Sequence, residues 1–502
     1  MKSKKFVCLL CIMLAVLMTA VCLPSCSGGG DEVVTTGSAT TEGVEGDTAS
    51  EHEIDRTFLP NASYNAADVT FLLQSGREEQ FYLLSDNEAD ADIYQQAVHT
   101  RNCYVEEKYD VVLDFIIAYN RNEFHVECSA ASMSGDCPYD IIISDYYYGL
   151  ETAGYLSNLN TYNVINFENP YWVSGWNEKA TVNNIIYSAV GYLNNDINSG
   201  AMVIFSNDYM AMDLGVADEI FADVKNGTWT LETMKTYMEK ATVDLNDDGF
   251  DFKDKYGLGY DLWSGRAFLS SCGIQLADYN DGEVSFKILS QTNADTFDEV
   301  KEFLTAGNLS YYGGRTGYDQ FDGPESNTQL FLQGRSLFLG QAMRFASQVN
   351  EQFEHFTIYP MPKRNTDQQE YITSLIGTCT QAILRGANDP EMSATILEAM
   401  NILSYLDTYP IYYDKLLKNR YQNSPETAAL IDTIIGCIKI DFAFVHSAAF
   451  NNLADRPFDA LDPKKATDIG GLGWYSGMGP VEKIANGQLE NFLEHYKEEA
   501  AS

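Results

Sequence analysis

The residues best suited to bind a ligand follow a short apolar run in the first third of the chain. Residues 139–149 read YDIIISDYYYG, and the three consecutive isoleucines predict a buried β-strand. Asp145, Tyr146 and Tyr147 come directly after that strand, at the end that faces the ligand crevice in α/β sheets. A carboxylate accepts hydrogen bonds from hydroxyl groups, and aromatic rings cover apolar C–H faces. This combination predicts a site for a polyhydroxylated, sugar-like ligand.

A second group of residues has the spacing of a calcium-binding loop. Asp244, Asn246 and Asp248 occupy alternate positions and Gly249 follows them, as at the start of an EF-hand loop. The twelfth position of such a loop holds a bidentate glutamate, whereas Lys255 stands there in this chain. An acidic turn between a helix and a strand explains the same residues. The sequence therefore requires no cofactor and predicts at most a calcium ion at this loop.

The common catalytic motifs do not occur in this sequence. None of the six histidines lies in an HExxH pattern, and there is no GxSxG, P-loop or GxGxxG motif. His125-Val126-Glu127 has the HxE spacing of zinc deaminases, but no PCxxC follows it. Among 72 acidic residues, a catalytic pair of carboxylates would not stand out. The absence of these motifs removes most of the standard enzymes without excluding an enzyme, and the sequence assigns no catalytic residue.

Strands and helices alternate along the part of the chain that must position these residues. Apolar runs predict strands over residues 68–73, 111–119 and 139–143. Amphipathic patterns and capping residues predict helices over residues 89–108 and 230–241, and from Asp389-Pro390 onward. This alternation over about 440 residues predicts an α/β protein with mostly parallel sheets and more than one domain.

The N-terminal segment has the pattern of an export signal. Three lysines within the first five residues precede an apolar run over residues 6–23. Leu23-Pro24-Ser25-Cys26 resembles the lipobox of bacterial lipoproteins, which implies a signal peptide over 1–26 and lipidation of Cys26. The run is also long enough for an uncleaved membrane anchor. Both interpretations place the chain outside the cytoplasm and attach it to the bacterial cell membrane.

The composition after the signal peptide restricts the partners of the protein. Residues 27–65 are rich in glycine, serine, threonine and acidic residues, which predicts a flexible acidic tether with a reach of about 35 Å. The whole chain has a formal net charge of −40, so we expect no nucleic-acid partner.

Six cysteines beyond the signal form no CxxC pair, which argues against zinc. They are Cys103, Cys128, Cys137, Cys272, Cys379 and Cys437. A Cys128–Cys137 bridge and buried free thiols are both compatible with the sequence.

Five segments together resemble family 1 extracellular solute-binding proteins of bacterial ABC importers, in their lipoprotein form. The five segments occur in the order of the family: PYDIIISDYYYGLETAGYLSNL (138–159), MVIFSNDYMAMDLG (202–215), GTWTLETMKTYMEKATVDLNDDGFDFKDKYGLGY (227–260), FLQGRSLFLGQAM (331–343) and FTIYPMPKRN (356–365). Two positions depart from the family pattern. Arg335 stands where lysine is common, and Asn207-Asp208 replaces Asn-Lys.

The resemblance implies a two-lobed, type 2 periplasmic-binding-protein fold of the α/β class, with a ligand cleft between the lobes. It implies lobe I over residues 66–197 and 378–422, lobe II over 203–373 and 426–502, and crossings near 195–204, 374–378 and 420–426. Such lobes close around a ligand by hinge motion. The closed form docks on ABC permease subunits, so the implied partners are a small-molecule ligand, a permease and, through the lipid anchor, a membrane. We expect a monomer.

By the same resemblance, Asp145, Tyr146 and Tyr147 are expected to contact the ligand. The further candidates are Tyr192 near the first crossing, Trp263 after a Tyr-Gly turn, Met343 and Arg344 after a buried strand, and Trp474 in a glycine-rich loop. The implied ligand is a carbohydrate or oligosaccharide.

The alternatives keep this fold and change the ligand or the role. A peptide or an anionic solute is the first alternative, and the anion would need arginines such as Arg77, Arg266, Arg315 or Arg344 in the cleft. A surface lipoprotein enzyme and a sensor without transport function are the others.

Overall fold

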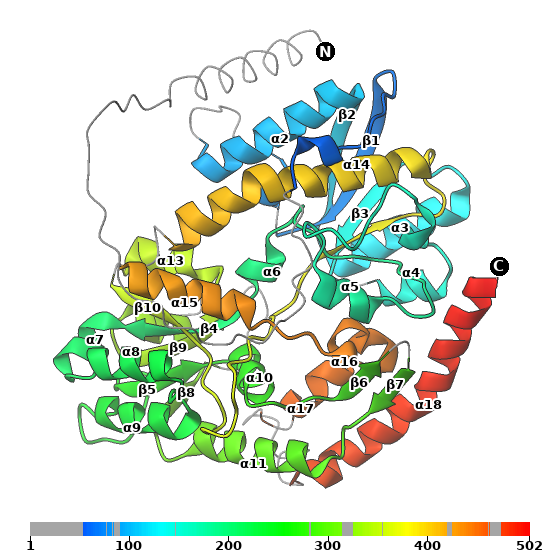
Figure 1. Cartoon of the computed structure of the whole chain (residues 1–502). Helices are drawn as coiled ribbons and strands as arrows, with labels where there is room; N and C mark the ends of the chain where they lie inside the picture. Colours follow the sequence, from blue (N-terminus) through cyan, green and yellow to red (C-terminus); the bar gives the residue numbers. More distant parts are fainter. Residues whose placement is uncertain are drawn as a thin grey trace, which may run out of the picture.

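The computed structural model describes residues 54–76, 78–82, 84, 91–145, 147–280, 283–313, 325–353, 355–418, 424–459, 461 and 473–501. These residues form two α/β lobes, each built around one sheet (Figure 1). No helix of the described ranges combines the length and the apolar character needed to cross a membrane. The expected signal peptide, the lipidation site Cys26 and the candidate Tyr146 lie outside the described residues.

The sheet of lobe I contains the three strands that the sequence predicts. Its order is β11-β3-β1-β2, with β1 parallel to β2 and β3, and β11 antiparallel to β3. The bounds are β1 (Ala67–Gln74), β2 (Val111–Ala118), β3 (Ile141–Ser144) and β11 (Thr380–Ile383). All four residues of β3 are buried, as expected for a continuous apolar run that is covered on both faces.

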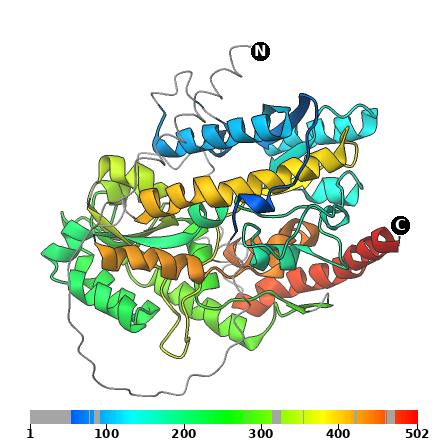
Figure 2. The ribbon, with the colours of Figure 1, turned by 45° about the horizontal axis from the view of Figure 1, so that its top comes forward.

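Helices cover the lobe I sheet, and two of them lie side by side in both views (Figure 1, Figure 2). These two are α2 (Ile93–Tyr109) and α14 (Pro390–Leu403). Asp389 caps α14 by accepting a hydrogen bond from the Met392 N–H at 3.0 Å, as the Asp-Pro pair predicts. After Leu403 the same helix continues in π-helical turns, η6 (Ser404–Thr408) and η7 (Ile411–Lys418).

The other helical elements of this part of the chain are short, apart from α3. They are η1 (Arg56–Phe58), η2 (Glu78–Gln80), α3 (Arg121–Ser134), α4 (Tyr148–Thr152), η4 (Leu159–Thr161), α5 (Ser174–Ala180) and α6 (Asp196–Ser199). Residues 54–65, at the end of the expected tether, include the η1 turn and pack on lobe I. Ile54 and Leu59 are buried there, and Arg56 binds Asp407 at 2.8 Å. The apolar side chains of this short segment stabilise that contact.

The sheet of lobe II has the order β10-β4-β9-β5-β8. The bounds are β4 (Met202–Asn207), β5 (Tyr256–Tyr260), β8 (Ser310–Tyr312), β9 (Ser336–Ala342) and β10 (Phe356–Pro360). β5 is parallel to β8 and β9, but β4 is antiparallel to both of its neighbours. The expectation of mostly parallel pairing is therefore wrong for β4. The chain enters β4 directly from lobe I, so no crossover helix within lobe II sets its direction.

Lobe II carries most of the remaining helices. They are α7 (Asp208–Asp213), α8 (Ala217–Asn226), α9 (Leu231–Ala241), α10 (Leu262–Ser271), α11 (Gln291–Thr305), α12 (Asn327–Leu332), α13 (Phe345–Gln352) and α15 (Pro425–Gly436). A hairpin of β6 (Ala277–Asn280) and β7 (Glu283–Phe286) projects beside them (Figure 1). Thr230 caps α9, as the sequence predicts, with the Thr233 N–H at 3.3 Å from its hydroxyl.

The C-terminal segment contacts both lobes, whereas the resemblance implied lobe II for all of it. Its elements are α16 (Phe442–Val445), η8 (Ser447–Phe450), η9 (Leu453–Asp455), α17 (Arg456–Asp459) and α18 (Gly473–Ala501). The start of α18 packs on α11, and its end reaches lobe I, where Arg385 binds Glu499 at 2.8 Å. The Tyr187 and Tyr496 rings also meet there, with centroids 5.5 Å apart.

Two crossings between the lobes run side by side. The Met202 N–H donates to Ser374 O and the Ile376 N–H to Gly200 O, both at 2.9 Å. A Cβ at Gly200 would lie 2.7 Å from Asp196 O and 2.8 Å from Gly377 O, so only glycine allows this close approach. The third crossing follows Lys418 and falls partly outside the described residues.

Of the described cysteines, Cys128, Cys137, Cys272, Cys379 and Cys437 are free thiols, and all but the last are buried. Cys103 is disulfide-bonded. Of the two alternatives that the sequence left open, the structure therefore has free thiols rather than a Cys128–Cys137 bridge. Burial raises the pKa of the Cys128 thiol, which keeps it protonated and unreactive.

We predict that Glu398→Ala destabilises the protein by about 3 kcal/mol, because two buried donors lose their acceptor. The Glu398 carboxyl accepts from the Tyr171 hydroxyl at 2.6 Å and from Trp172 Nε1 at 2.9 Å. Urea denaturation at neutral pH measures the change, with Glu107→Ala on the exposed face of α2 as the control. A loss no larger than that of the control would show that these bonds do not hold lobe I together.

Candidate functional site

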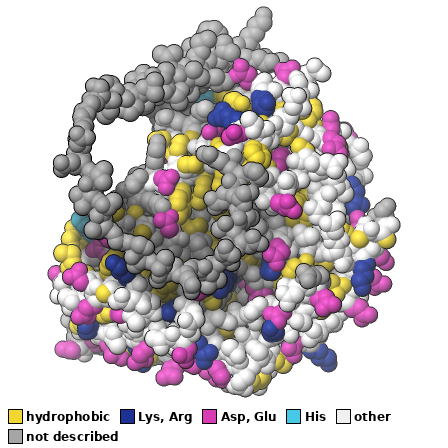
Figure 3. Space-filling model, viewed as in Figure 1, with side chains coloured by type: hydrophobic (Ala, Val, Ile, Leu, Met, Phe, Trp, Pro, Cys, Tyr) yellow, Lys and Arg dark blue, Asp and Glu magenta, His cyan; other side chains and the backbone are white. Residues whose placement is uncertain are grey.

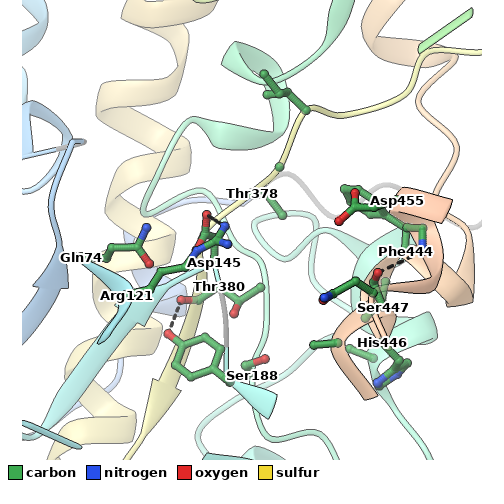
Figure 4. Close-up of a pocket in the computed structure, with 18 of the residues that line it drawn as sticks. Gln74, Arg121, Asp145, Ser188, Thr378, Thr380, Phe444, His446, Ser447 and Asp455 are labelled. Atoms are coloured by element: carbon green, nitrogen blue, oxygen red, sulfur yellow. Dashed lines mark hydrogen bonds and ion pairs between the residues drawn. The ribbon is translucent and has the colours of Figure 1, made fainter. Parts of the chain in front are cut away.

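A cleft of about 980 Å³ lies between the ends of the lobe I strands and the opposite wall formed by α10 and the C-terminal segment. Its lobe I wall comes from residues that follow β1, β2 and β3 and precede β11. These are the strand ends at which α/β sheets bind ligands. In Figure 4, Gln74, Arg121, Asp145 and Thr380 face Phe444, Ser447 and Asp455 across this space.

An ion pair organises the lobe I wall. Asn120 caps α3 by accepting from the Glu123 N–H at 3.0 Å, so the helix begins at Arg121, beside the end of β3. Arg121 binds Asp145 with both arms of its guanidinium, Nε to Oδ1 at 2.9 Å and Nη2 to Oδ2 at 2.7 Å (Figure 4). The Asp145 side chain is only 8% exposed, so little of its carboxylate is accessible beyond the ion pair with this arginine.

Aromatic rings reach the cleft from both lobes. Tyr119 directly follows β2 and is 78% exposed. Trp263 lies in the first turn of α10, half-buried. Asp261 fixes that turn, because it follows β5 and caps α10 by accepting from the Ser264 N–H at 2.8 Å. Such rings can stack on the apolar face of a ligand.

The buried Arg266 shapes the opposite wall. Its guanidinium lies 3.3 Å from Asp455 Oδ1, donates to Leu375 O at 3.3 Å, and stacks over the Phe444 ring at 4.4 Å. Burial lowers the pKa of Arg266, and the Asp455 carboxylate opposes that shift. Arg266 thus joins α10, the second crossing and the C-terminal segment at one point of the cleft.

Two further titratable groups line the cleft. His446 is buried, its Nε2–H donates to Lys179 O at 2.9 Å, and burial lowers its pKa to about 4. Glu151 lies in α4, near Tyr187 and Tyr496, and burial raises its pKa to about 7. Both groups therefore favour their neutral forms near neutral pH more than free side chains do.

The structure brings four of the predicted site residues to this cleft: Asp145, Tyr147, Trp263 and Arg344. Tyr147 lines the cleft, but its hydroxyl is already satisfied. It accepts from the Ser144 N–H at 2.7 Å and donates to Thr380 O at 2.7 Å, tying β3 to β11. This geometry gives Tyr147 a structural role.

Three other predicted site residues lie elsewhere. Tyr192 packs against the Tyr405 and Tyr409 rings, at 5.2 and 4.5 Å. Met343 is fully buried. Trp474 lies in the first turn of α18 rather than in a loop, and it is buried, with its Nε1–H donating to Ile288 O at 2.9 Å. The sequence pattern could not show that these apolar groups complete the core instead of the cleft.

The loop considered for calcium uses its carboxylates on its own backbone. Asp244 accepts from the Asp247 N–H at 2.7 Å and from the Gly249 N–H at 3.0 Å. Asn246 and Asp248 lie exposed in the same turn. Within the described ranges, no three His, Cys, Asp or Glu side chains gather in a way that could hold a metal ion. Calcium binding at Asp244, Asn246 and Asp248 stays a prediction.

The fold matches solved structures, although no protein-family model and no curated protein matches the sequence. ABC substrate-binding protein Lmo0181 from Listeria monocytogenes, in complex with cycloalternan, has a TM-score of 0.55 at 12% identity, covering 85% of this chain and 99% of that one. The maltose/maltodextrin-binding domain MalE from Bdellovibrio bacteriovorus, bound to maltotriose, has a TM-score of 0.54 at 12% identity, covering 84% and 100%. The chain has a periplasmic-binding-protein fold. The galacto-N-biose/lacto-N-biose I-binding protein of Bifidobacterium longum, in complex with lacto-N-biose, matches this fold at 13% identity, with a TM-score of 0.53 over 86% of this chain and 98% of that one.

The sequence analysis missed several residues that line the cleft of this periplasmic-binding-protein fold. Tyr119 ends the predicted strand 111–119 and Arg121 lies two residues beyond it, so the rule that led to Asp145 could also have found them. Phe444, His446 and Asp455 belong to short helical turns far along the chain, and no motif marks them. Only the packing of the C-terminal segment brings them to the cleft.

We predict that Tyr147→Phe lowers the free energy of unfolding by about 1–3 kcal/mol, because the buried Ser144 N–H and Thr380 O lose their partner. Ligand affinity of the folded variant should stay unchanged, since the hydroxyl points into the sheet. Denaturant titration and ligand titration measure the two effects. Tyr155→Phe, at a half-buried tyrosine outside the cleft lining, is the control. A stable variant with weakened binding would assign Tyr147 to the ligand instead.

We predict that protonation of His446 lowers the free energy of unfolding as the pH falls. Its pKa is about 4 in the native state, below the ordinary value of 6.5, so the unfolded state takes up the proton first as the pH falls. The stability that the neutral ring contributes is complete above pH 6.5 and is lost toward pH 4, by about 3 kcal/mol. Urea titrations from pH 7 to 4 should show a smaller acid loss in His446→Gln than in the parent or in the exposed control His355→Gln. Parallel pH profiles for all three would contradict this.

Proposed function

We propose that this protein is the substrate-binding lipoprotein of an ABC importer. In this proposal, lipidated Cys26 anchors the chain, the acidic tether holds the lobes above the membrane, and the cleft captures an extracellular oligosaccharide. The loaded protein then delivers the sugar to permease subunits. The protein performs no covalent chemistry on its ligand.

The observation that carries this proposal is the composition of the cleft. The exposed ring of Tyr119 from lobe I and the half-buried ring of Trp263 from lobe II reach this space. The rest of its lining mixes amide, hydroxyl and charged side chains with apolar ones such as Ile376 and Val445. Sugars present apolar C–H faces for the rings and hydroxyl groups for the polar side chains. A volume of about 980 Å³ lies at the upper end of the ~300–1,000 Å³ range of small-molecule sites, which favours an oligosaccharide over a single sugar.

The fold supports the proposal in two further ways. Each wall of the cleft is built from different elements, so a hinge motion at the paired crossings would bring Tyr119 and Trp263 closer to a bound sugar. The solved structures with this fold that are named above were determined with cycloalternan, maltotriose and lacto-N-biose. We infer the ligand class from this agreement between the cleft chemistry and the ligands of those proteins.

A melting-temperature screen against mono- and oligosaccharides, amino acids and peptides tests the proposal. A sugar at 100 times its dissociation constant should stabilise the native state by about 2.7 kcal/mol. Trp263→Ala and Tyr119→Ala should each weaken binding of that sugar about tenfold, because a stacking surface is lost. Tyr209→Ala, at an exposed tyrosine of α7 outside the cleft lining, should leave affinity unchanged.

Two results would overturn this function. Recovery of a cleaved sugar after incubation would show an enzyme rather than a binding protein. A melting shift with peptides or amino acids, and with none of the sugars, would keep the fold and reject the carbohydrate. Isothermal titration with the intact, recovered sugar is the measurement that completes the test.

A further inference from the structure

The described lining of the cleft contains as many arginines as acidic residues, but not all of them form ion pairs. Among the described lining residues, the arginines are Arg121, Arg266 and Arg344, and the acids are Asp145, Glu151 and Asp455. Two of the arginines already hold an acid of the cleft, since Arg121 binds Asp145 at 2.7 Å and Arg266 lies 3.3 Å from Asp455. One arginine and one glutamate are left to meet a ligand.

Among the cleft arginines, Arg344 is the one without a partner in the described residues. Its backbone N–H donates to Ser199 O at 2.8 Å, which fixes the residue beside the first crossing, between β9 and α13. Its side chain is half-buried and lines the cleft. Within the described part of the chain, its guanidinium forms no hydrogen bond, ion pair or ring contact. A half-buried arginine in a cleft presents a planar fork of donors that matches a carboxylate.

Glu151 does not neutralise Arg344. It lies in α4, among Tyr187 and Tyr496, whereas Arg344 lies beside the crossings. Burial also raises the pKa of Glu151 to about 7, so part of the population is uncharged near neutral pH. Glu151 also lines another, smaller cavity of about 240 Å³ against α18. Glu151 is therefore placed to meet hydroxyl groups of a ligand rather than the arginine.

The arginines of the cleft contrast with the rest of the molecule. The chain has 72 acidic and 32 basic residues, and acidic side chains are spread over the face shown in Figure 3. Exposed charges are screened by salt within about 10 Å, whereas those in a partly enclosed cleft act on a ligand at short range. The uncompensated charge that a bound ligand meets is thus positive, although the protein is strongly negative.

We infer that the cleft takes an acidic saccharide, an oligosaccharide that carries a carboxylate as a uronic acid does, and that Arg344 forms the ion pair with it. This inference rests on the proposed function, because it assigns the substrate class of the same cleft. The aromatic rings would stack on the sugar rings, and Arg344 would select the charged unit near the crossings. An ion-paired hydrogen bond at this site should favour the acid about 10- to 100-fold over its neutral counterpart.

Matched pairs of sugars test the inference on the full chain. The probes are oligogalacturonates and oligomannuronates against their methyl esters, and glucuronoxylo-oligosaccharides against xylo-oligosaccharides of equal length. Isothermal titration should show that one acid binds at least tenfold more tightly than its neutral partner. Arg344→Gln should remove this preference without lowering the melting temperature of the unliganded protein, and Arg344→Lys should restore part of it. Lys240→Gln, which removes an exposed positive charge outside the cleft lining, should change nothing.

Each other outcome has a defined meaning. If neutral sugars bind as well as or better than their acids, the proposed function stands and the acidic ligand is rejected. If the acid is preferred and Arg344→Gln keeps that preference in a folded protein, Arg344 is not the partner, and this inference fails. If no sugar of either kind binds and peptides do, both the carbohydrate function and this inference fail.

Discussion

The cleft depends on the two chain crossings that run side by side between the lobes. Their backbones approach so closely at Gly200 that no side chain fits, and hydrogen bonds from Met202 and Ile376 join them. The Asp196 carboxylate adds a bond to the Cys379 N–H at 2.7 Å. The crossings therefore fix the line along which the two lobes meet, and a hinge motion about that line would change the distance between the cleft walls.

The C-terminal segment contacts both lobes and would limit such a hinge motion. Its α18 helix packs on lobe II at its start and on lobe I at its end, through Arg385 and Glu499. The Trp176 ring of lobe I also meets the Phe444 ring of α16, with centroids 5.8 Å apart. Any opening of the lobes must break one set of these contacts. Opening of the cleft therefore depends on whether α18 and α16 keep their contacts with lobe I.

The arginines of the cleft give its lining a local charge that differs from the net charge of the chain. A net charge of −40 describes the solvated surface, where acids repel one another and salt screens them. Inside the cleft, Asp145 and Asp455 each lie against an arginine. Arg344 is the remaining positive charge of the described lining. Composition averages over the whole chain, so it does not show where the arginines of the cleft lie.

The sequence by itself determined the local structure. Three strands of lobe I, the Thr230 and Asp389 caps and the position of Asp145 at a strand end all follow from short patterns, because propensity and capping act within a few residues. Tertiary structure decided which side chains share the cleft. Trp474 is apolar and near a turn, yet it completes a core, while Asp455 reaches the cleft from a segment without a motif. Burial and proximity depend on contacts between residues hundreds of positions apart, and no pattern within a short window contains them.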